Sequence, residues 1–380
     1  MIVTSARTYI DLHVLHTVPP ANLNRDDNGD PKEAFFGGVR RSRVSSQAWK
    51  RATRAFFAEH NPDGDRAMRT KKIAEQLTRR LAERASLDTE TAARIATSAL
   101  QPLDIKPGKK AGETAYLLFF GHAQLDAVID LFVDDVAELC ELGDEDLAAR
   151  LKDLPVQQTL NQGHPLDVGL FGRMVADIPA LNVDAATQVA HALSTHAVEL
   201  EMDYYTAVDD KQVDSTGAGM IGTVGFNSAT FYRYATVGLH QLETNLADPA
   251  AARDGIRLFT EAFARSMPTG KENAFAHHTR PTLVAAVIRG DQPVSLVSAF
   301  EKPVASTSGI AATSARRLAE EHSRSVAQWG DNPLFTGVCH TLDPDSPEAG
   351  KVGEAFGDNR TFAELLDAVQ AHLPAVQEVA

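Results

Sequence analysis

Hydrophobic and polar residues alternate over Tyr9–Val18 (YIDLHVLHTV), which predicts a half-buried β-strand that Pro19-Pro20 ends. After a polar loop, a helix is predicted, because Ser45 or Ser46 is a favourable N-cap and the following apolar residues recur at helical spacing. The predicted apolar stripe of this helix comprises Ala48, Ala52, Ala55 and Phe56.

Helical periodicity dominates the stretch from about residue 61 to residue 186, where Ala-, Leu- and Arg-rich blocks are separated by Gly, Pro and Lys turns. This pattern predicts a helical insertion. Its predicted helical blocks are Met68–Ala85, Thr89–Leu100, Ala115–Val136 and Asp144–Leu154.

The second half of the chain mixes both periodicities. A helix is predicted over Val183–Val198 and a strand over Glu199–Tyr205. A Gly-, Asp- and Ser-rich excursion, Asp209–Gly225, then leads into the β-prone run Phe226–Val237, so we predict a long hairpin. Further predicted elements are a helix over Leu258–Met267, a strand over Pro281–Ile288 and a helix from Ser306 to Arg324.

The order of these elements predicts an α+β fold. A strand, a helix near residue 46 and later strands separated by large insertions fit a ferredoxin-like βαββαβ core. That core is also the scaffold of RRM domains, whose sheet binds single-stranded RNA.

The composition mainly excludes several classes of protein and of functional site. The chain has 380 residues, of which 43% are hydrophobic and 23% charged. It shows no apolar run of about eighteen residues and no signal-peptide pattern, and its two cysteines match no metal or redox spacing. We therefore expect a cytoplasmic protein that does not contact a membrane. No common catalytic or nucleotide-binding motif is present, so no cofactor, metal site or catalytic residue is predicted.

Charge is distributed unevenly along the chain, whose formal net charge is −14. Residues 25–54 hold eight Lys and Arg against four Asp and Glu, whereas residues 126–153 hold ten acidic residues against two basic ones. Between Phe35 and Ala58 there is no acidic residue. The cations of that basic stretch are Arg40, Arg41, Arg43, Lys50, Arg51 and Arg54.

The basic stretch contains further parts of a phosphate-binding site. Gly37-Gly38 give the backbone freedom, and Ser45-Ser46-Gln47 open a helix whose N–H groups and dipole attract anions. Lys50 and Arg54, four residues apart, share one helix face. We therefore predict that the stretch binds a nucleic-acid backbone. The alternative is a surface helix with ordinary solubilising charges.

The loop after the first strand contains Asn24, Arg25, Asp26 and Asp27. Arg25 presents a planar fork suited to phosphate oxygens, and Asn24 suits turns and backbone hydrogen bonds. In the alternative interpretation, this is a turn in which Arg25 pairs with an adjacent Asp. The two carboxylates could also hold Mg²⁺ for phosphodiester cleavage, but no further ligands follow from the sequence.

Aromatic residues flank the predicted hairpin. If these side chains are exposed, they can stack on nucleic-acid bases. If they are buried, they form the core of a sheet, and because side chains alternate between the two faces of a strand, some of them must be buried. They are Tyr204, Tyr205, Phe226, Phe231, Tyr232 and Tyr234. Met174 follows Gly172-Arg173, a setting in which Met typically fills a core.

Four sequence blocks between residues 23 and 242 together resemble the CasC family, the repeated backbone subunits of the type I-E CRISPR complex Cascade. The blocks are LNRDD, AFFGGVRRSRVSSQAWKRATR, AHALSTHAVELEMDYYTAVDD and FNSATFYRYATVGLHQL. The resemblance implies a right-hand shape with an RRM-like palm. Its implied parts are the palm (residues 1–59, 187–199 and 228–380), the helical fingers (60–186) and a hairpin-like thumb (200–227).

The resemblance also implies a function and a set of contacts. Several copies would stack head-to-tail along a CRISPR RNA, bind other Cascade subunits and present the RNA for pairing with target DNA, without catalysis. Arg25, Lys32, Lys50 and Arg54 would contact the RNA backbone. Met174, Tyr204 and Tyr205 would pack near displaced nucleotides, and Arg173 is a further predicted RNA-binding residue. An RNA-cleaving subunit that uses Asp26 or Asp27 is the alternative.

Overall fold

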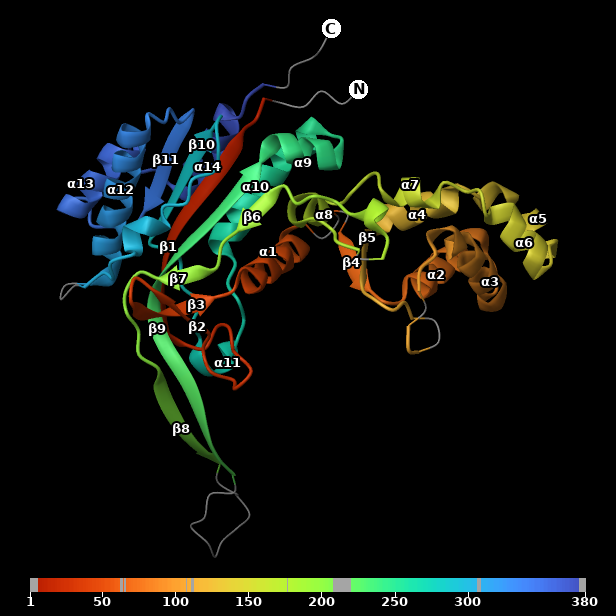
Figure 1. Ribbon diagram of the computed structural model, residues 1–380, viewed down its shortest axis with the longest axis horizontal. Helices are drawn as coiled ribbons and strands as arrows, with labels where there is room; N and C mark the ends of the chain where they lie inside the picture. Colours follow the sequence, from red (N-terminus) through yellow and green to blue (C-terminus); the bar gives the residue numbers. More distant parts are fainter. Residues whose placement is uncertain are drawn as a thin grey trace, which may run out of the picture.

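The computed structural model describes residues 6–61, 64, 66–106, 108–110, 113–175, 177–207, 220–305 and 309–375. A large antiparallel sheet with helices on both faces forms its centre, a helical lobe extends to one side, and a long hairpin projects away from both (Figure 1). Within the described ranges, no helix is long and apolar enough to cross a bilayer.

The elements have the following bounds. The strands are β1 (Tyr9–Ala21), β2 (Glu33–Phe36), β3 (Val39–Val44), β4 (Ala67–Thr70), β5 (Leu118–Gly121), β6 (Thr187–Val189), β7 (Ala192–Ser194), β8 (Glu201–Ala207), β9 (Met220–Gly238), β10 (Leu283–Arg289) and β11 (Phe335–His340). The helices are α1 (Ser46–His60), α2 (Ile73–Ala85), α3 (Thr89–Leu100), α4 (His122–Asp130), α5 (Val136–Glu141), α6 (Asp144–Leu151), α7 (Val156–Leu160), α8 (Leu166–Phe171), α9 (Leu239–Leu246), α10 (Pro249–Arg265), α11 (Glu272–Phe275), α12 (Ile310–Trp329), α13 (Pro347–Phe356) and α14 (Phe362–His372), with a 3₁₀ turn η4 (Val297–Phe300).

The main sheet has the order β11-β10-β1-β9-β7-β3-β2. Its centre is built along the chain as β1, α1, β6 and β7, β9, α10 and β10, and in space β10, β1, β9 and β7 lie side by side. This is the predicted ferredoxin-like βαββαβ arrangement. The α+β prediction is therefore confirmed.

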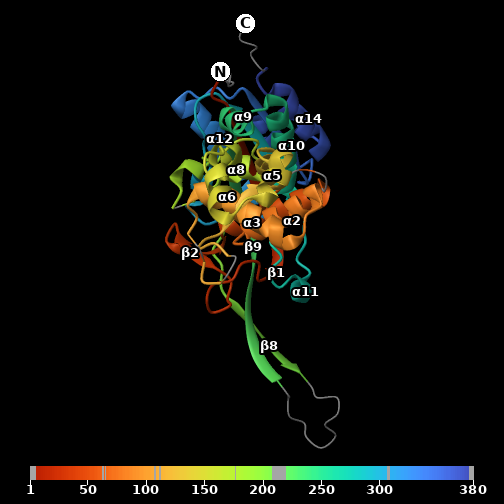
Figure 2. The ribbon, with the colours of Figure 1, turned by 90° about the vertical axis from the view of Figure 1, so that its right-hand side faces the viewer.

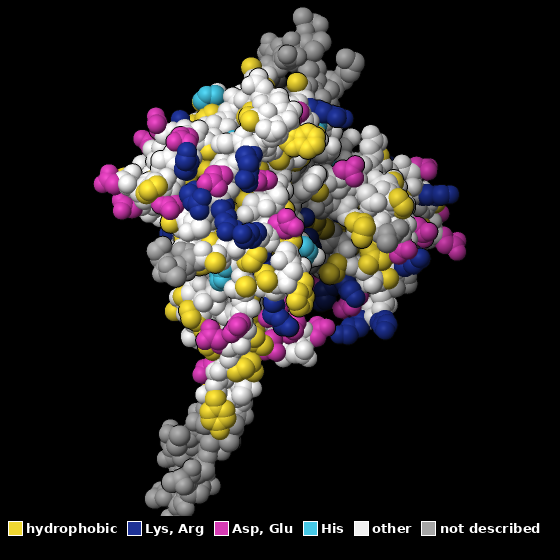
Figure 3. Space-filling model, turned by 60° about the vertical axis from the view of Figure 1, so that its left-hand side comes forward, with side chains coloured by type: hydrophobic (Ala, Val, Ile, Leu, Met, Phe, Trp, Pro, Cys, Tyr) yellow, Lys and Arg dark blue, Asp and Glu magenta, His cyan; other side chains and the backbone are white. Residues whose placement is uncertain are grey.

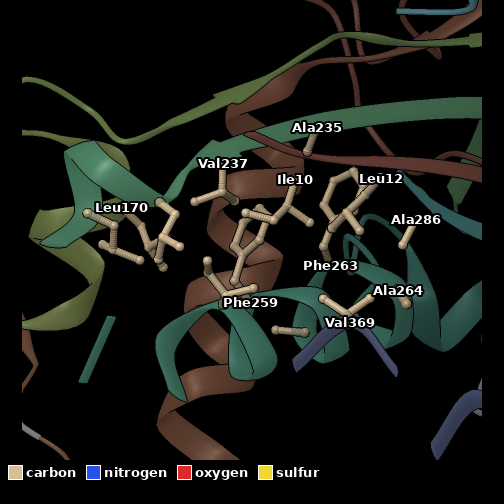
Figure 4. Close-up of a cluster of buried hydrophobic side chains, with 14 of the residues drawn as sticks. Ile10, Leu12, Leu170, Ala235, Val237, Phe259, Phe263, Ala264, Ala286 and Val369 are labelled. Carbon is tan, nitrogen blue, oxygen red and sulfur yellow. The ribbon is translucent and has the colours of Figure 1, made fainter. Parts of the chain in front are cut away.

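Both faces of the central sheet are covered. On one face, apolar side chains of β1, β9 and β10 pack against α1, α10 and α14, as Ile10, Val237, Phe259 and Val369 do in Figure 4. On the other face, the same strands pack against η4, α12 and α13. Helices α12 and α13 occupy the face that an RRM sheet offers to RNA, so that face is closed to a ligand here.

Strand β1 differs from the prediction in two ways. It is almost fully buried rather than half-buried, because it lies between β9 and β10 with helices on both faces. It also continues through Pro19-Pro20 to Ala21, with a shift in its register to β9 after Val18. A β-bulge accommodates proline, which cannot donate to the ladder.

Helix α1 begins as predicted, with Ser45 as its N-cap. Its apolar stripe is rotated from the predicted one: Ala48 is half-buried and Ala55 exposed, whereas Trp49 and Phe57 are buried. The large aromatic side chains gain more from burial than the alanines, so they set the orientation of the helix.

The helical lobe has a hydrophobic core of its own, built by α2 to α7. Its predicted helix at Thr89–Leu100 is confirmed, and Asp88 caps it by accepting from the N–H groups of Glu90 and Thr91. The predicted helices near residues 68 and 118 are wrong at their starts, where β4 and β5 pair with each other.

The helix predicted over Val183–Val198 is wrong. The segment forms β6 and β7, which pair with β9, and β7 also pairs with β3. The Ala-rich sequence of this segment favours a helix locally. If the segment were helical, however, the backbone N–H and C=O groups of β9 and β3 that it now pairs with would lose their hydrogen-bond partners.

The predicted long hairpin is formed by β8 and β9, which pair from Glu201↔Phe226 to Ala207↔Met220. It projects well below the sheet (Figure 2). Of the excursion predicted between its strands, residues 209–219 lie outside the described residues, whereas residues 220–225 belong to β9, so that part of the prediction is wrong. Toward the C-terminus, the predicted helix is present as α12, whereas β11, α13 and α14 were not predicted.

Candidate nucleic-acid interface

A polar groove of about 1610 Å³ runs along α1. Three segments line it: the loop of residues 23–29, one face of α1, and residues 265–280 after α10. Its cationic side chains are Arg25, Arg51, Arg265, Lys271 and Arg280, and its carboxylates are Asp26, Asp27, Glu59 and Glu272. The groove is large enough for a polymer strand and brings together segments far apart in the sequence.

Helical spacing decides which part of α1 faces the groove. Gln47, Arg51, Ala55 and Glu59 follow one another at four-residue intervals and all line it. The predicted binding residues Gln47 and Arg51 are therefore accessible there. Lys50 and Arg54 lie on another side of the helix, toward the fingers.

The loop of residues 24–32 is held by its own hydrogen bonds. Asn24 Oδ1 accepts from the N–H of Ser45 at 2.8 Å, and its carbonyl accepts from the N–H of Lys32 at 2.8 Å. Arg25 is exposed, and within the described residues it forms no ion pair with an adjacent Asp. The interpretation that Arg25 is neutralised in a turn is therefore not what the structure shows.

The paired carboxylates of this loop have different surroundings. Asp26 Oδ1 accepts from the N–H groups of Asn28 and Asp30, at 2.9 and 3.0 Å, and so stabilises the turn. Asp27 is exposed. Among the described residues, no group of three or more His, Cys, Asp or Glu is placed to hold a metal ion.

Gly37-Gly38 form the turn of the β2–β3 hairpin rather than a loop at a helix start. Their φ values of +60° and +77° are those of a two-residue type I′ turn. A Cβ added to Gly37 would lie 1.6 Å from the carbonyl oxygen of Glu301, whereas one on Gly38 would meet nothing within 4 Å.

Alanine substitution at these two positions is therefore expected to reduce stability by different amounts. We expect Gly38→Ala to lower the free energy of unfolding by about 1–2 kcal/mol, the strain of a left-handed Ala. Gly37→Ala adds the displacement of the Glu301 carbonyl, for a total of about 3 kcal/mol or more. Urea unfolding of the two variants measures this, and equal losses would contradict the close contact.

Arg41 lies in the interior, contrary to the prediction that the whole basic stretch faces a ligand. Its exposed fraction is 0%, and its guanidinium donates to the carbonyls of Phe36, Ser194, Phe300 and Glu301 at 2.8–3.1 Å. Burial lowers the pKa of Arg41. It is a structural residue that joins the hairpin to β7 and η4.

The neighbouring arginines are partly engaged by the protein. Arg40 is exposed and pairs with Glu33. Arg43 donates through Nε to the carbonyl of Glu33 at 3.1 Å, and its Nη1 lies 3.3 Å from His191 Nδ1. Lys32, half-buried, acts on the same histidine, whose pKa is lowered by burial and then by Arg43 and Lys32.

The first turn of α1 is largely satisfied by the protein. The N–H of Ser46 lies 3.3 Å from His191 Nδ1, and the N–H of Ala48 donates to Ser45 Oγ at 3.3 Å. The N–H of Ser45 donates to Asn24 Oδ1, so the N–H groups of Ser45, Ser46 and Ala48 all have partners within the protein.

The locations of Arg173 and Met174 are the reverse of those predicted: Arg173 is buried and Met174 is exposed. Arg173 is 4% exposed and donates to the carbonyls of Leu181, Phe119 and Leu160, so it is not a surface contact. Met174 is 84% exposed, and its interpretation as core filler is wrong. An exposed Met is available for contact with a ligand.

The aromatic residues divide between core and surface. Phe231, Tyr232 and Tyr234 are buried, whereas Tyr204 and Tyr205 are 60% and 42% exposed on β8. Hydrophobic side chains are visible along the surface of this hairpin in Figure 3. The hairpin thus presents apolar side chains that this chain does not itself cover.

Sequence reasoning missed four accessible cations, one of which is Arg265 at the end of α10. Lys271 and Arg280 line the groove from a segment with no recognised pattern, and Arg69 lies on β4 beside α1. Nothing local distinguishes them, because only the fold brings these segments to α1.

Comparisons with known proteins agree with this architecture. A family model for CT1975-like proteins matches residues 10–368. A chain of a solved "CRISPR RNA-guided surveillance complex, pre-nicking" is 31% identical, with a TM-score of 0.81 over 96% of this chain and 99% of that chain. A chain of another "CRISPR RNA-guided surveillance complex" is 28% identical, with a TM-score of 0.73 over 96% and 100% of the two chains. No curated protein matches the chain.

Proposed function

The chain belongs to the CT1975-like protein family, and we propose that it is a CRISPR RNA-binding backbone subunit of a Cascade-type surveillance complex. The observation that carries the proposal is the likeness, along 96% of the chain, to a chain of an RNA-guided surveillance complex. The four sequence blocks between residues 23 and 242 support the narrower assignment to type I-E and to the CasC group. Such a subunit acts in the cytoplasm.

In this proposal the groove along α1 holds the RNA backbone. A subunit that must accept any guide sequence binds phosphate and ribose, and leaves the base edges free to pair with target DNA. Arg25 and Arg51 are the accessible predicted cations in the groove, and Gln47 adds a neutral donor. Arg280 joins them from the segment that follows α10.

Copies of the chain associate head-to-tail in this proposal. A heterologous interface produces an open helical array, which matches a linear RNA. The exposed Met202, Tyr204 and Tyr205 support a thumb that reaches a neighbouring copy and its RNA. Other subunits of the complex then bind the ends of the array.

We propose that the subunit does not cleave nucleic acid. The competing function is Mg²⁺-dependent RNA cleavage by Asp26 or Asp27, and the use of Asp26 Oδ1 within its own turn argues against it. Incubation of the assembled complex with complementary RNA and Mg²⁺ is expected to leave the RNA intact. Periodic cleavage that Asp26→Ala or Asp27→Ala abolishes would overturn the non-catalytic assignment.

Native mass spectrometry of the chain purified from cells that express a CRISPR array tests the main proposal. We expect several copies on one RNA. Arg25→Gln with Arg51→Gln should reduce the amount of bound RNA, because both cations line the groove. A chain recovered free of RNA and as a monomer would contradict the proposal.

A further inference from the structure

Two cations, one from the palm and one from the fingers, meet around one aromatic ring, and a third lies one turn away on the same palm helix. The guanidinium carbons of Arg54, on α1, and Arg69, on β4, each lie 4.7 Å from the centroid of Phe119, so they are no more than twice that distance apart. Lys50 lies one turn before Arg54 on α1, with Nζ 5.7 Å from the Phe171 centroid. Residues distant in sequence thus form one cluster.

Hydrogen bonds fix the cluster in place. Arg54 Nε pairs with Asp167 at 3.0 Å, and its Nη2 donates to the carbonyl of Ala67 at 3.1 Å. Asp167 accepts in turn from the N–H of Ala67 at 3.1 Å. These bonds join α1 to the first residue of β4, and the pairing Arg69↔Phe119 places Arg69 beside the ring.

The cluster carries more positive charge than the protein neutralises. Of the ion pairs in the described part of the chain, only Arg54–Asp167 involves it, so the single carboxylate of Asp167, which also acts on Arg69, stands against three cations. Burial lowers the pKa values of Lys50 and Arg69, and each is lowered further by a neighbouring cation: Lys50 by Arg69, and Arg69 by Arg54. An anion bound among them would relieve this repulsion.

We propose that Arg69, on β4 of the fingers, completes a phosphodiester-binding site with Lys50 and Arg54 on α1 of the palm, two residues to which the family resemblance already assigns contacts with the RNA backbone. Arg69 is the new member, and the site is separate from the groove, which these three residues do not line. Arg69 is exposed, and Arg54 retains 25% exposure of its side chain, so both can reach a phosphate. The inference rests on the proposed function, because it takes the phosphate from bound RNA.

The site has a consequence for the orientation of the fingers. A phosphate held by both α1 and β4 adds an attachment between the palm and the helical lobe beyond the Arg54–Asp167 pair. Exposed Met174 belongs to the same region, since the preceding Arg173 donates to the carbonyl of Phe119 at 3.3 Å. RNA at this site therefore contacts palm and fingers together.

Binding of a fluorescein-labelled oligouridylate, measured by anisotropy over a range of salt concentrations, tests the site. We expect Arg69→Gln to weaken binding roughly fourfold at physiological salt and to reduce the slope of log K against log salt by about 0.7, the value for one lost contact to a single strand. Arg69→Lys should retain most of the slope. Arg79→Gln, an exposed arginine on α2 of the same lobe, is the matched control and should bind as the unchanged chain does.

A double-mutant cycle identifies the shared phosphate. If Lys50 and Arg69 hold one group, Arg69→Gln costs less in the Lys50→Gln background than alone. Three outcomes would each overturn the site while leaving RNA binding by the unchanged chain intact. They are an unchanged salt slope for Arg69→Gln, additive effects in the cycle, and an equal loss of binding for Arg79→Gln. Absence of RNA binding by the unchanged chain would instead reject the proposed function, and the site with it.

Discussion

Arg41→Ala is expected to lower the free energy of unfolding by about 3–5 kcal/mol, whereas Arg40→Ala should cost less than about 1 kcal/mol. Adjacent in sequence and identical in type, the two arginines differ in environment. Arg41 is fully buried and donates to four carbonyl oxygens, and its loss leaves those acceptors and a cavity without compensation. Arg40 forms only a solvent-exposed pair with Glu33.

Urea unfolding at constant pH measures this difference as a shift of the midpoint with an unchanged m-value. Arg41→Lys is the informative third variant. A lysine ammonium cannot reach acceptors arranged for a planar guanidinium, so it should recover only a small part of the loss. Similar, small losses for Arg40→Ala and Arg41→Ala would show that the contacts of Arg41 contribute little to stability.

Acid is expected to destabilise the protein strongly between pH 6.5 and 5. His16 is buried, and burial followed by the charge of Arg233 lowers its pKa to about 3. Its geometry requires the neutral ring, because Arg233 Nη1 lies 2.9 Å from His16 Nδ1 and can only donate. His13 and His322 are buried too, and burial lowers their pKa values in the same direction, for His322 to about 4.

The direction of this change in stability with pH follows from proton uptake by the unfolded chain. Below the ordinary histidine pKa of about 6.5, the unfolded chain binds protons that the folded chain excludes, so stability is present above that pH and is lost as the pH falls. Each histidine contributes up to about 1.4 kcal/mol per pH unit, and the three together cost roughly 5 kcal/mol by pH 5. Urea unfolding at several pH values measures the slope.

Two substitutions provide the control for this prediction. His16→Asn should reduce the pH slope by about one proton, because the amide can still accept from Arg233 but does not titrate. His278→Asn removes a histidine whose side chain is 59% exposed, so comparison of the two variants isolates the effect of burial. A stability that is flat from pH 6.5 to 5, or equal slopes for both variants, would contradict the burial of neutral histidines.

Elements with strong local signals were predictable from the sequence. The N-cap at Ser45, the helix over Thr89–Leu100 and the β-prone run Phe226–Val237 appear as expected, because capping and periodicity act within a few residues. Thr187–Val189 and Ala192–Ser194 were not, since their strand structure depends on pairing with β9 and β3.

The candidate site was predictable only in part. The sequence identified the basic stretch and the loop with Arg25, yet gave no indication that Lys271, Arg280 and Arg69 would face the same helix. Lys271 and Arg280 reach α1 through contacts between segments more than a hundred residues apart, and Arg69 reaches it from the helical lobe. No local sequence pattern encodes either kind of contact. The paired carboxylates were visible, but the use of Asp26 within a turn was not.

The sequence by itself determined that this acidic chain concentrates uncompensated positive charge between Phe35 and Ala58, and that the stretch joins a glycine turn to a capped helix. Only the tertiary structure decided what each cation does. Arg51 lines the groove, Lys50 and Arg54 lie at the fingers, and Arg41 is buried among carbonyls. Charge is a property of residue type, whereas access to a ligand depends on what packs around each side chain, and that is set by the fold as a whole.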